Sequence, residues 1–320
     1  MSDIAFIIAI IPSLCWGSLG ILSTIFGGNA SQQTVGLTYG GLLFGLLTYF
    51  GWVVPHHYFM DSKLIWIGLI SGILWALGQA FQFLAIKTMH GVSIALPLSM
   101  TSQLIGNALL GAALLGEWTS IQQWVVGIIA IGLIVSGVLM IQKRDNKNKA
   151  TPSGVNCHGL FQVLVSTLAY MGYFITPRLM QRWLHISNNI VTAGHGINYM
   201  VAIVLPQSIG MVIGAYLYVF LISHETKYLH ARPTWQNVIV GVVWALGNVT
   251  MFISIANPRL GQATATTLGQ LGFIVGAFGG IFILHEHKTR WQLKMIVGGS
   301  IIALIGAVII SNISWFAALI

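Results

Sequence analysis

The chain is poor in charge, and the few charges that it carries are mostly positive. Only 6% of its 320 residues are charged, with 6 acids against 14 lysines and arginines. Soluble domains carry about 25% charged residues, so this composition excludes a soluble protein. The positive excess does not indicate a nucleic-acid partner, because the basic residues of membrane proteins gather in the cytoplasmic loops. We therefore expect no nucleic acid among the partners.

Cysteines and catalytic motifs are equally scarce. Cys15 and Cys157 are the only cysteines, which is too few for a disulfide framework. The sequence contains no HExxH, GxSxG or P-loop motif. His285-Glu286-His287 is the nearest approach to a metal site, but its i, i+2 spacing points the two imidazoles apart and no third ligand pattern accompanies it. The sequence therefore predicts no enzyme, no metal and no cofactor.

What the chain has in abundance is long apolar runs. Hydrophobic residues make up 56% of it, and the mean hydropathy is +0.84. A membrane helix needs about 20 apolar residues. The sequence therefore predicts an all-α integral membrane protein with ten transmembrane helices, near residues 4–25, 34–54, 64–86, 92–115, 121–142, 158–177, 200–222, 235–256, 262–284 and 292–312. No basic segment precedes the first span, so we expect it to stay in the membrane.

One long hydrophilic run divides the ten spans five and five. We expect residues 1–142 to form a first five-helix repeat, 143–157 a polar linker, and 158–320 a second five-helix repeat. Residues 178–200 are partly polar, and we expect them outside the membrane or at its interface; an eleventh span is the alternative. Most lysines and arginines fall on the side of the linker, which predicts that the linker is cytoplasmic and both termini are outside.

Two landmarks recur at one spacing, which indicates a duplicated unit. Trp75-Ala76-Leu77-Gly78-Gln79 returns as Trp244-Ala245-Leu246-Gly247-Asn248, 169 positions later. Leu115-Gly116-Glu117 returns as Leu284-His285-Glu286 at the same offset. Because each unit holds an odd number of spans, the second must enter the membrane in the opposite sense. We therefore predict two inverted five-helix repeats, related by a pseudo-two-fold axis in the membrane plane, as in many secondary transporters.

Uncharged polar side chains lie inside the spans, where hydrocarbon normally demands leucine or valine. They are the amides and hydroxyls Gln79, Gln82, Gln103, Asn107, Asn248, Thr264, Thr266 and Gln270. A buried amide without a partner is costly, so each must face another helix or a wet cavity. Amides donate and accept hydrogen bonds, which suits the hydroxyls of a neutral polyol. The aromatic residues that can lie flat against a sugar ring are Trp16, Trp75, Tyr170 and Trp244.

Acidic residues are absent from the centres of the predicted spans. Ion coupling in membranes usually relies on such a residue. Glu117 and Glu286 occupy equivalent places in the two halves, near span ends, and are the candidates for coupling or gating; a helix-end anchor or a loop salt bridge is the alternative for both.

Several motifs together resemble the glucose/ribose porter family of bacterial sugar uptake proteins, within the drug/metabolite transporter superfamily. They are Leu14-Cys15-Trp16-Gly17-Ser18, Gly68-Leu69-Ile70-Ser71-Gly72, the two Trp-Ala-Leu-Gly motifs, Leu115-Gly116-Glu117-Trp118, Pro206-Gln207-Ser208-Ile209-Gly210-Met211 and Gly279-Gly280-Ile281-Phe282-Ile283-Leu284. The resemblance covers nearly the whole chain. It implies ten helices in two inverted halves, uptake of glucose or ribose, and proton symport. His285 departs from the pattern where the first half has Gly116.

We interpret the chain as a secondary transporter that takes a neutral monosaccharide across the bacterial plasma membrane by alternating access. The predicted site lies between spans 1, 3, 4, 6, 8 and 9. Its predicted substrate-binding residues are Trp16, Gln79, Gln103, Asn107, Tyr170, Asn248 and Gln270. The expected partners are the sugar, protons and the lipid bilayer. The alternatives are an exporter of amino acids or amphipathic metabolites on the same fold, and a membrane regulatory subunit that transports nothing.

Overall fold

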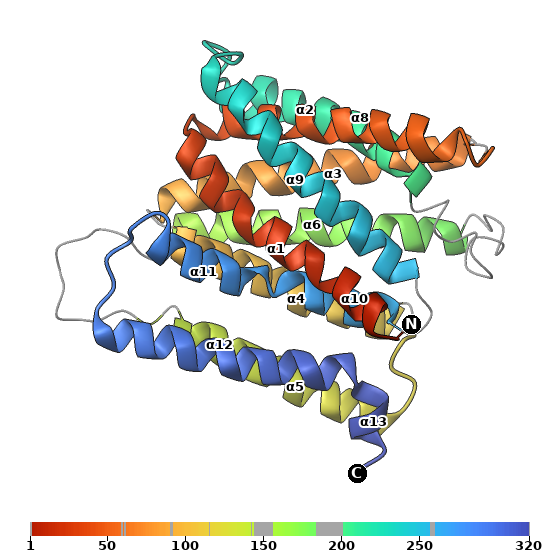
Figure 1. Ribbon diagram of the computed structural model, residues 1–320, viewed down its shortest axis with the longest axis vertical. Helices are drawn as coiled ribbons and strands as arrows, with labels where there is room; N and C mark the ends of the chain where they lie inside the picture. The colour runs from red at the N-terminus through yellow and green to blue at the C-terminus, as the bar shows by residue number, and fades with distance from the viewer. Residues whose placement is uncertain are drawn as a thin grey trace.

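The described part of the chain is helical throughout (Figure 1). The computed structural model describes residues 2–58, 60, 62–89, 92–114, 116–141, 143, 156–183, 201–256 and 260–319. In these ranges the helices are α1 (Ser2–Phe26), α2 (Ala30–Thr48), α3 (Ser62–Thr88), α4 (Val92–Leu114), α5 (Ile121–Ile141), α6 (Cys157–Trp183), α8 (Val204–Tyr218), α9 (Arg232–Ala256), α10 (Gly261–Gln270), α11 (Gly272–Phe282), α12 (Arg290–Ser311) and α13 (Ile313–Ala317). Short π-helical turns, η1 (Tyr49–Val53) and η3 (Val219–Ser223), extend α2 and α8.

The predicted all-α membrane architecture is confirmed. Within the described ranges, ten stretches are long and apolar enough to cross a membrane, and their ends differ from the predicted ones by only a few residues. The ninth span was predicted as one helix but is divided into α10 and α11 at Leu271. The short helix α13 was not predicted. The helix α6 continues to Trp183, whereas residues 184–200 and the linker residues 144–155 lie outside the described residues.

Local sequence fixes where two of the spans begin. The side chain of Asn29 accepts a hydrogen bond from Gln32 N (2.8 Å), and Gln32 Oε1 accepts one from Asn29 N (3.0 Å). Thr289 and Gln292 form the same reciprocal pair before α12. Such capping boxes satisfy amide groups that the first turn of a helix leaves without partners. The polar residues at these positions therefore define the starts of α2 and α12.

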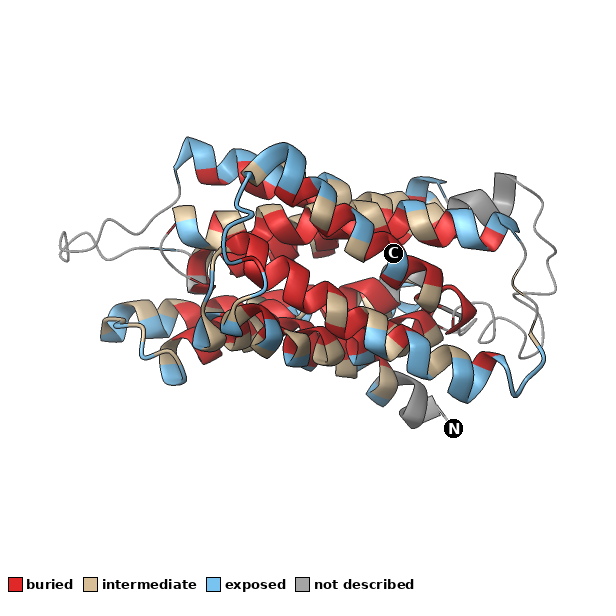
Figure 2. Cartoon of the chain, turned by 90° about the horizontal axis from the view of Figure 1, so that it is seen from above, coloured by how far each residue is buried: buried red, intermediate tan, exposed pale blue. Residues whose placement is uncertain are grey.

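The helices pack in layers, with α2 and α8 at one edge of the bundle and the α5–α12 pair at the other (Figure 1). Buried residues lie on the facing sides of the helices, and exposed residues lie on their outer sides and at their ends (Figure 2). On α5 and α12 the outward residues are large and apolar, for example Ile128, Ile129, Ile301 and Ile305. An apolar outer face is the surface that the hydrocarbon of a bilayer requires.

Glycines bring helix backbones into contact at matching places in the two halves. A Cβ atom added at Gly72 of α3 would lie 2.0 Å from the carbonyl oxygen of Gln207 of α8, and one added at Gly241 of α9 would lie 2.0 Å from the carbonyl oxygen of Leu37 of α2. Gly241 follows Gly72 by 169 positions, and Gln207 follows Leu37 by 170. Lipid gives helices no hydrophobic reason to associate, so small residues at such contacts supply the close packing instead.

The two Glu-containing loops also share one geometry. Glu117 N donates to Gly111 O (3.2 Å), and Glu286 N donates to Gly280 O (3.0 Å). The preceding residues both have a left-handed backbone, with φ of +70° at Gly116 and +54° at His285. A non-glycine residue can adopt this left-handed backbone, and the energetic cost is small. The substitution of histidine for glycine in the second motif therefore leaves the turn intact.

The contact at Gly72 predicts a strong effect of a single added methyl group. We expect Gly72→Ala to destabilise the protein by about 1–3 kcal/mol, because the new Cβ would overlap the Gln207 carbonyl. The matched control is Gly132→Ala on α5, where no atom lies within 4 Å of the added Cβ; this change should be neutral or slightly stabilising. Thermal unfolding of the purified variants in detergent measures both. Equal unfolding temperatures for the two variants would contradict the described packing.

Candidate functional site

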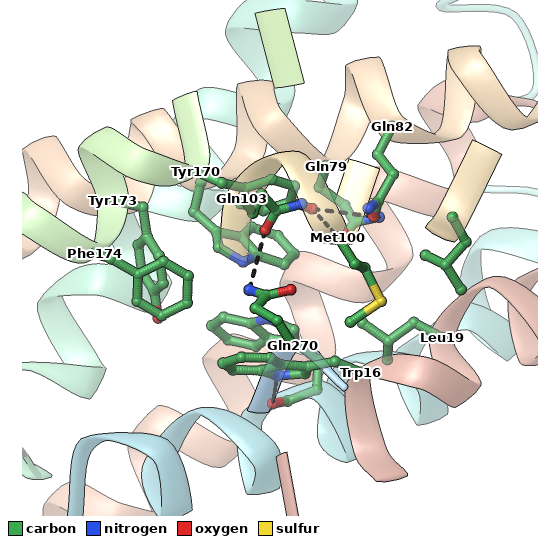
Figure 3. Close-up of a pocket in the computed structure, with 13 residues that line it drawn as sticks. Trp16, Leu19, Gln79, Gln82, Met100, Gln103, Tyr170, Tyr173, Phe174 and Gln270 are labelled. Carbon is green, nitrogen blue, oxygen red and sulfur yellow. Dashed lines mark hydrogen bonds between the residues drawn. The ribbon is translucent and has the colours of Figure 1, made fainter. Parts of the chain in front are cut away.

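A pocket lined largely by buried side chains lies in the middle of the bundle (Figure 3). Six elements line it, namely α1, α3, α4, α6, α9 and α10, which correspond to the predicted spans 1, 3, 4, 6, 8 and 9. The lining residues are Trp16, Leu19, Trp75, Gln79, Gln82, Leu96, Met100, Gln103, Tyr170, Tyr173, Phe174, Trp244 and Gln270. None of these side chains is charged.

Helical periodicity explains which side chains reach the pocket from each element. Gln79 and Gln82 are three residues apart on α3, as are Tyr170 and Tyr173 on α6. Residues three or four apart lie on one face of a helix. Each helix therefore contributes a short stripe of one or two turns to the wall.

The amides on the wall are linked to one another through hydrogen bonds. The hydroxyl of Tyr170 donates to Gln79 Oε1 (2.7 Å), and Gln79 Nε2 donates to Gln82 Oε1 (3.3 Å). Gln82 Nε2 then donates to the hydroxyl oxygen of Ser99 (2.9 Å). Gln103 Nε2 donates to the same Ser99 oxygen (3.0 Å). Ser99 thus joins the amides of α3 to those of α4.

The chain of hydrogen bonds ends at Gln270 with an acceptor that has no partner. Gln270 Nε2 donates to Gln103 Oε1 (3.3 Å), while Gln270 Oε1 is buried and has no hydrogen-bond partner among the described residues (Figure 3). A buried acceptor without a donor costs about 1–3 kcal/mol. This oxygen is therefore ready to accept a hydrogen bond from a bound hydroxyl group or a water molecule.

Aromatic rings form the rest of the wall. The rings of Trp75 and Trp244 pack together with centroids 4.4 Å apart, so the two landmarks that are 169 positions apart in the sequence meet in space. Tyr170 lies edge-on to Trp75 (6.1 Å), and Trp16 lies beside Phe174 (5.7 Å). Trp16 Nε1 donates to the backbone oxygen of Trp244 (3.3 Å), which holds its ring in place.

The helix break between α10 and α11 lies directly beside Gln270. Leu271 N donates to Leu268 O (3.2 Å) and Ile274 N to Leu271 O (3.0 Å), so these amides bond three residues back rather than four. Close contact with α1 accompanies the break, because a Cβ added at Gly272 would lie 2.6 Å from Ser13 O. The equivalent helix of the first half, α4, is continuous. The ninth span thus differs from its counterpart at the pocket.

The structure brings most of the predicted site residues together. Trp16, Gln79, Gln103, Tyr170 and Gln270 all line the pocket. Asn107 and Asn248 are buried but do not line it.

The two asparagines differ in their surroundings. Asn248 Oδ1 accepts a hydrogen bond from the hydroxyl of Tyr173, which does line the pocket. Neither polar atom of Asn107 has a hydrogen-bond partner among the described residues. Asn248 therefore orients a pocket residue, whereas Asn107 is an unsatisfied amide one turn along α4 from Gln103.

The two candidate glutamates lie away from the pocket. Glu117 follows α4 and Glu286 follows α11, and both are partly buried in their loops. Glu286 Oε2 lies 3.4 Å from Lys288 Nζ. Since α4 and α11 are antiparallel, with Leu96 against Gly276 and Met100 against Gly272, the two glutamates stand at opposite ends of the bundle. Within the ten spans as described there is no acidic residue.

Sequence reasoning missed Tyr173 and Phe174 as pocket residues, and Ser99 as the residue that joins the amides of the wall. Ser99 lies one turn before Gln103 on α4, and Tyr173 and Phe174 lie one turn after Tyr170 on α6. Extending each predicted stripe by one helical turn would have found all three.

Comparison with known proteins gives one consistent result. The profile of the family described as "Sugar transport protein" matches residues 7–313. A protein of Lactiplantibacillus plantarum, with the provisional name of sugar uptake protein, is 36% identical over 308 residues, which cover 95% of this chain and 98% of that protein. The glucose uptake protein GlcU of Bacillus subtilis is 33% identical over 306 residues, which cover 94% of this chain and 96% of that protein. A solved crystal structure with 14% sequence identity matches with a TM-score of 0.58. The match covers 94% of this chain and 98% of that chain, which shows the same fold.

The connected amides and the isolated Asn107 predict opposite effects on stability. Gln82→Leu should destabilise the protein by about 1–3 kcal/mol, because Ser99, Gln79 and Tyr170 all lose a partner in a buried site. Asn107→Leu should not destabilise it, since no hydrogen bond is lost. Thermal unfolding in detergent compares the two. If Asn107→Leu unfolds as early as Gln82→Leu, Asn107 has a partner that this arrangement lacks.

Proposed function

The chain belongs to the sugar transport protein family, and from this premise we propose that it takes up a neutral monosaccharide, glucose or ribose, by alternating access. It is a multi-pass protein of the bacterial plasma membrane, with ten helices able to span the bilayer. The relatives are named for sugar or glucose uptake. The proposals of a neutral substrate, of alternating access and of proton coupling are argued from the structure of this chain.

The observation that supports a neutral sugar best is the pocket wall of uncharged amides and aromatic rings. A charged substrate would need an opposite charge in this buried place, because an unpaired buried charge is far more costly than a buried amide. Amides offer both donors and acceptors for hydroxyl groups. The aromatic rings offer flat apolar faces to the C–H side of a sugar ring.

The hydrogen-bonded chain gives each residue a role in this proposal. Gln79, Gln103 and Gln270 bind hydroxyl groups, and Trp16 and Tyr170 pack against the sugar ring. The amides bond to one another directly or through Ser99, so sugar binding would exchange one set of hydrogen bonds for another at little net cost. Gln270 Oε1 has no bond to lose and gains one. Asn248 acts indirectly, through the hydroxyl of Tyr173.

Alternating access is supported by the relation between the halves. In an inverted repeat, equivalent helices that touch must run antiparallel. The helices α2 and α8 do so, since Ser31 meets Ser223 (2.9 Å) while Ser208 donates to Gly41 O (3.0 Å). Gly137 of α5 likewise contacts Gly299 of α12, and Gly306 contacts Ala130. We place the pseudo-two-fold axis at the packed pair Trp75 and Trp244, beside the pocket.

Removal of one wall amide tests the sugar site. Gln79→Leu should lower the affinity for sugar about tenfold, since one lost hydrogen bond leaves a hydroxyl unpaired at about 1.4 kcal/mol. Asn248→Leu should have a smaller effect, because it acts through Tyr173. The control is Gln162→Leu on α6, a buried glutamine whose Oε1 has no partner and which does not line the pocket. Uptake of radiolabelled glucose and ribose by cells without other porters measures the effects. Wild-type affinity in Gln79→Leu would remove Gln79 from the site.

We propose further that protons drive uptake through the glutamates at the two ends of the bundle. A proton that crosses 100 mV supplies about 2.3 kcal/mol, enough for about fifty-fold accumulation of sugar. We expect an uncoupler to abolish accumulation, and Glu117→Gln or Glu286→Gln to do the same while exchange of labelled sugar continues. Glu225→Gln is the control, since Glu225 bonds to Ser31 (2.7 Å) away from both loops. Accumulation that survives the uncoupler would refute proton coupling.

A further inference from the structure

Two tyrosines and a histidine meet on the outer surface, away from the pocket. His230 Nε2 lies 2.9 Å from the hydroxyl of Tyr39 and 2.9 Å from that of Tyr216, and the two hydroxyls also contact each other. The rings of Tyr39 and His230 are stacked, with centroids 6.1 Å apart. These residues come from α2, α8 and the segment before α9, so the triad joins both halves of the chain.

The protons of this triad cannot satisfy all three contacts at once. Each hydroxyl carries one proton, and a ring nitrogen either donates or accepts but does not do both. If Nε2 accepts, only two protons serve three contacts. If Nε2 carries a proton, it donates to one hydroxyl, that hydroxyl donates to the other, and the last hydroxyl proton is left over. With a proton on Nε2, the triad therefore has one hydroxyl donor left to bond outside its members.

The surroundings of the triad match the boundary between lipid and water. His230 is exposed, and Trp235, whose Nε1 donates to His230 O (3.1 Å), is 57% exposed. One and two turns before Tyr216, toward the middle of the span, α8 presents the exposed apolar side chains Ile213 and Ile209. In Figure 1, α2 and α8 lie at one edge of the bundle. Tryptophan and tyrosine concentrate at this level in membrane proteins.

The charges beside the triad favour an anion. The segment 224–232 contains Lys227, Arg232 and His224 as well as His230. Its one acid, Glu225, accepts a hydrogen bond from Ser31 (2.7 Å). Basic groups next to a membrane helix attract anionic headgroups, by about 1 kcal/mol for each lysine or arginine.

We propose that His230, Tyr39 and Tyr216 bind the phosphate of an anionic phospholipid, with its acyl chains along the apolar face of α8. The surplus hydroxyl proton donates a charge-assisted hydrogen bond to a phosphate oxygen, and Lys227 and Arg232 of the neighbouring segment add positive charge. Ile213 and Ile209 supply the apolar surface that a free phosphate ion would not use.

Native mass spectrometry of the detergent-purified protein tests this, with equal amounts of phosphatidylglycerol and phosphatidylcholine. We expect wild type to retain phosphatidylglycerol preferentially. The double variant Tyr39→Phe/Tyr216→Phe should lower its affinity about tenfold, because it removes the charge-assisted hydrogen bond to the phosphate. The single variant His230→Gln should also lower it, because it removes the ring nitrogen that both hydroxyls contact. The matched control is Tyr49→Phe in η1, which removes a tyrosine hydroxyl at the other end of the same span. Since only folded protein is counted, loss of some material does not obscure the result.

Two outcomes would overturn the proposal. Equal retention of phosphatidylglycerol by wild type and by the double variant would show that the triad does not hold the headgroup. Displacement of the lipid by excess inorganic phosphate would show a site for a free anion instead. Sugar uptake is not involved in the measurement, because none of the three residues lines the pocket.

Discussion

The structure depends on one constraint, the need of a carboxamide inside a membrane to find a hydrogen-bond partner. Four buried glutamines meet this need by bonding to one another directly or through Ser99, namely Gln79, Gln82, Gln103 and Gln270. The bonds fix the positions of α3, α4 and α10 relative to one another. They also satisfy the polar groups that line the pocket, at positions where a membrane span would otherwise have leucine or valine.

Close backbone contact provides the frame around this polar centre. Because lipid tails are as apolar as leucine, helices gain little by hiding leucine from lipid. Gly72 and Gly241 instead let a carbonyl of the neighbouring helix approach to a distance at which no side chain fits. Smooth contacts of this kind hold helices together without interlocking side chains, which suits a protein whose halves are proposed to move against each other.

The two halves match in their frame and differ in their pocket. Gly72 with Gly241, Gly116 with His285, and Trp75 with Trp244 occupy equivalent places. At the pocket, however, the position equivalent to Gln103 is Gly272, and the helix breaks beside it. Under the proposed duplication, the shared positions supply the architecture, and the differences beside Gln270 make the wall of the pocket asymmetric.

The sequence by itself determined the spans and the neutral, polar character of the site, because a membrane helix must be apolar for about 20 residues and any amide within it stands out. It also selected Trp16, Gln79, Gln103, Tyr170 and Gln270, which the pocket brings together. Only the tertiary structure decided that Asn248 bonds to Tyr173, that Asn107 stands apart, that Ser99 joins two helices and that the ninth span breaks at Leu271. The physical reason is that composition fixes which residues enter the membrane, whereas the rotation of each helix and the neighbours it meets fix what each side chain touches.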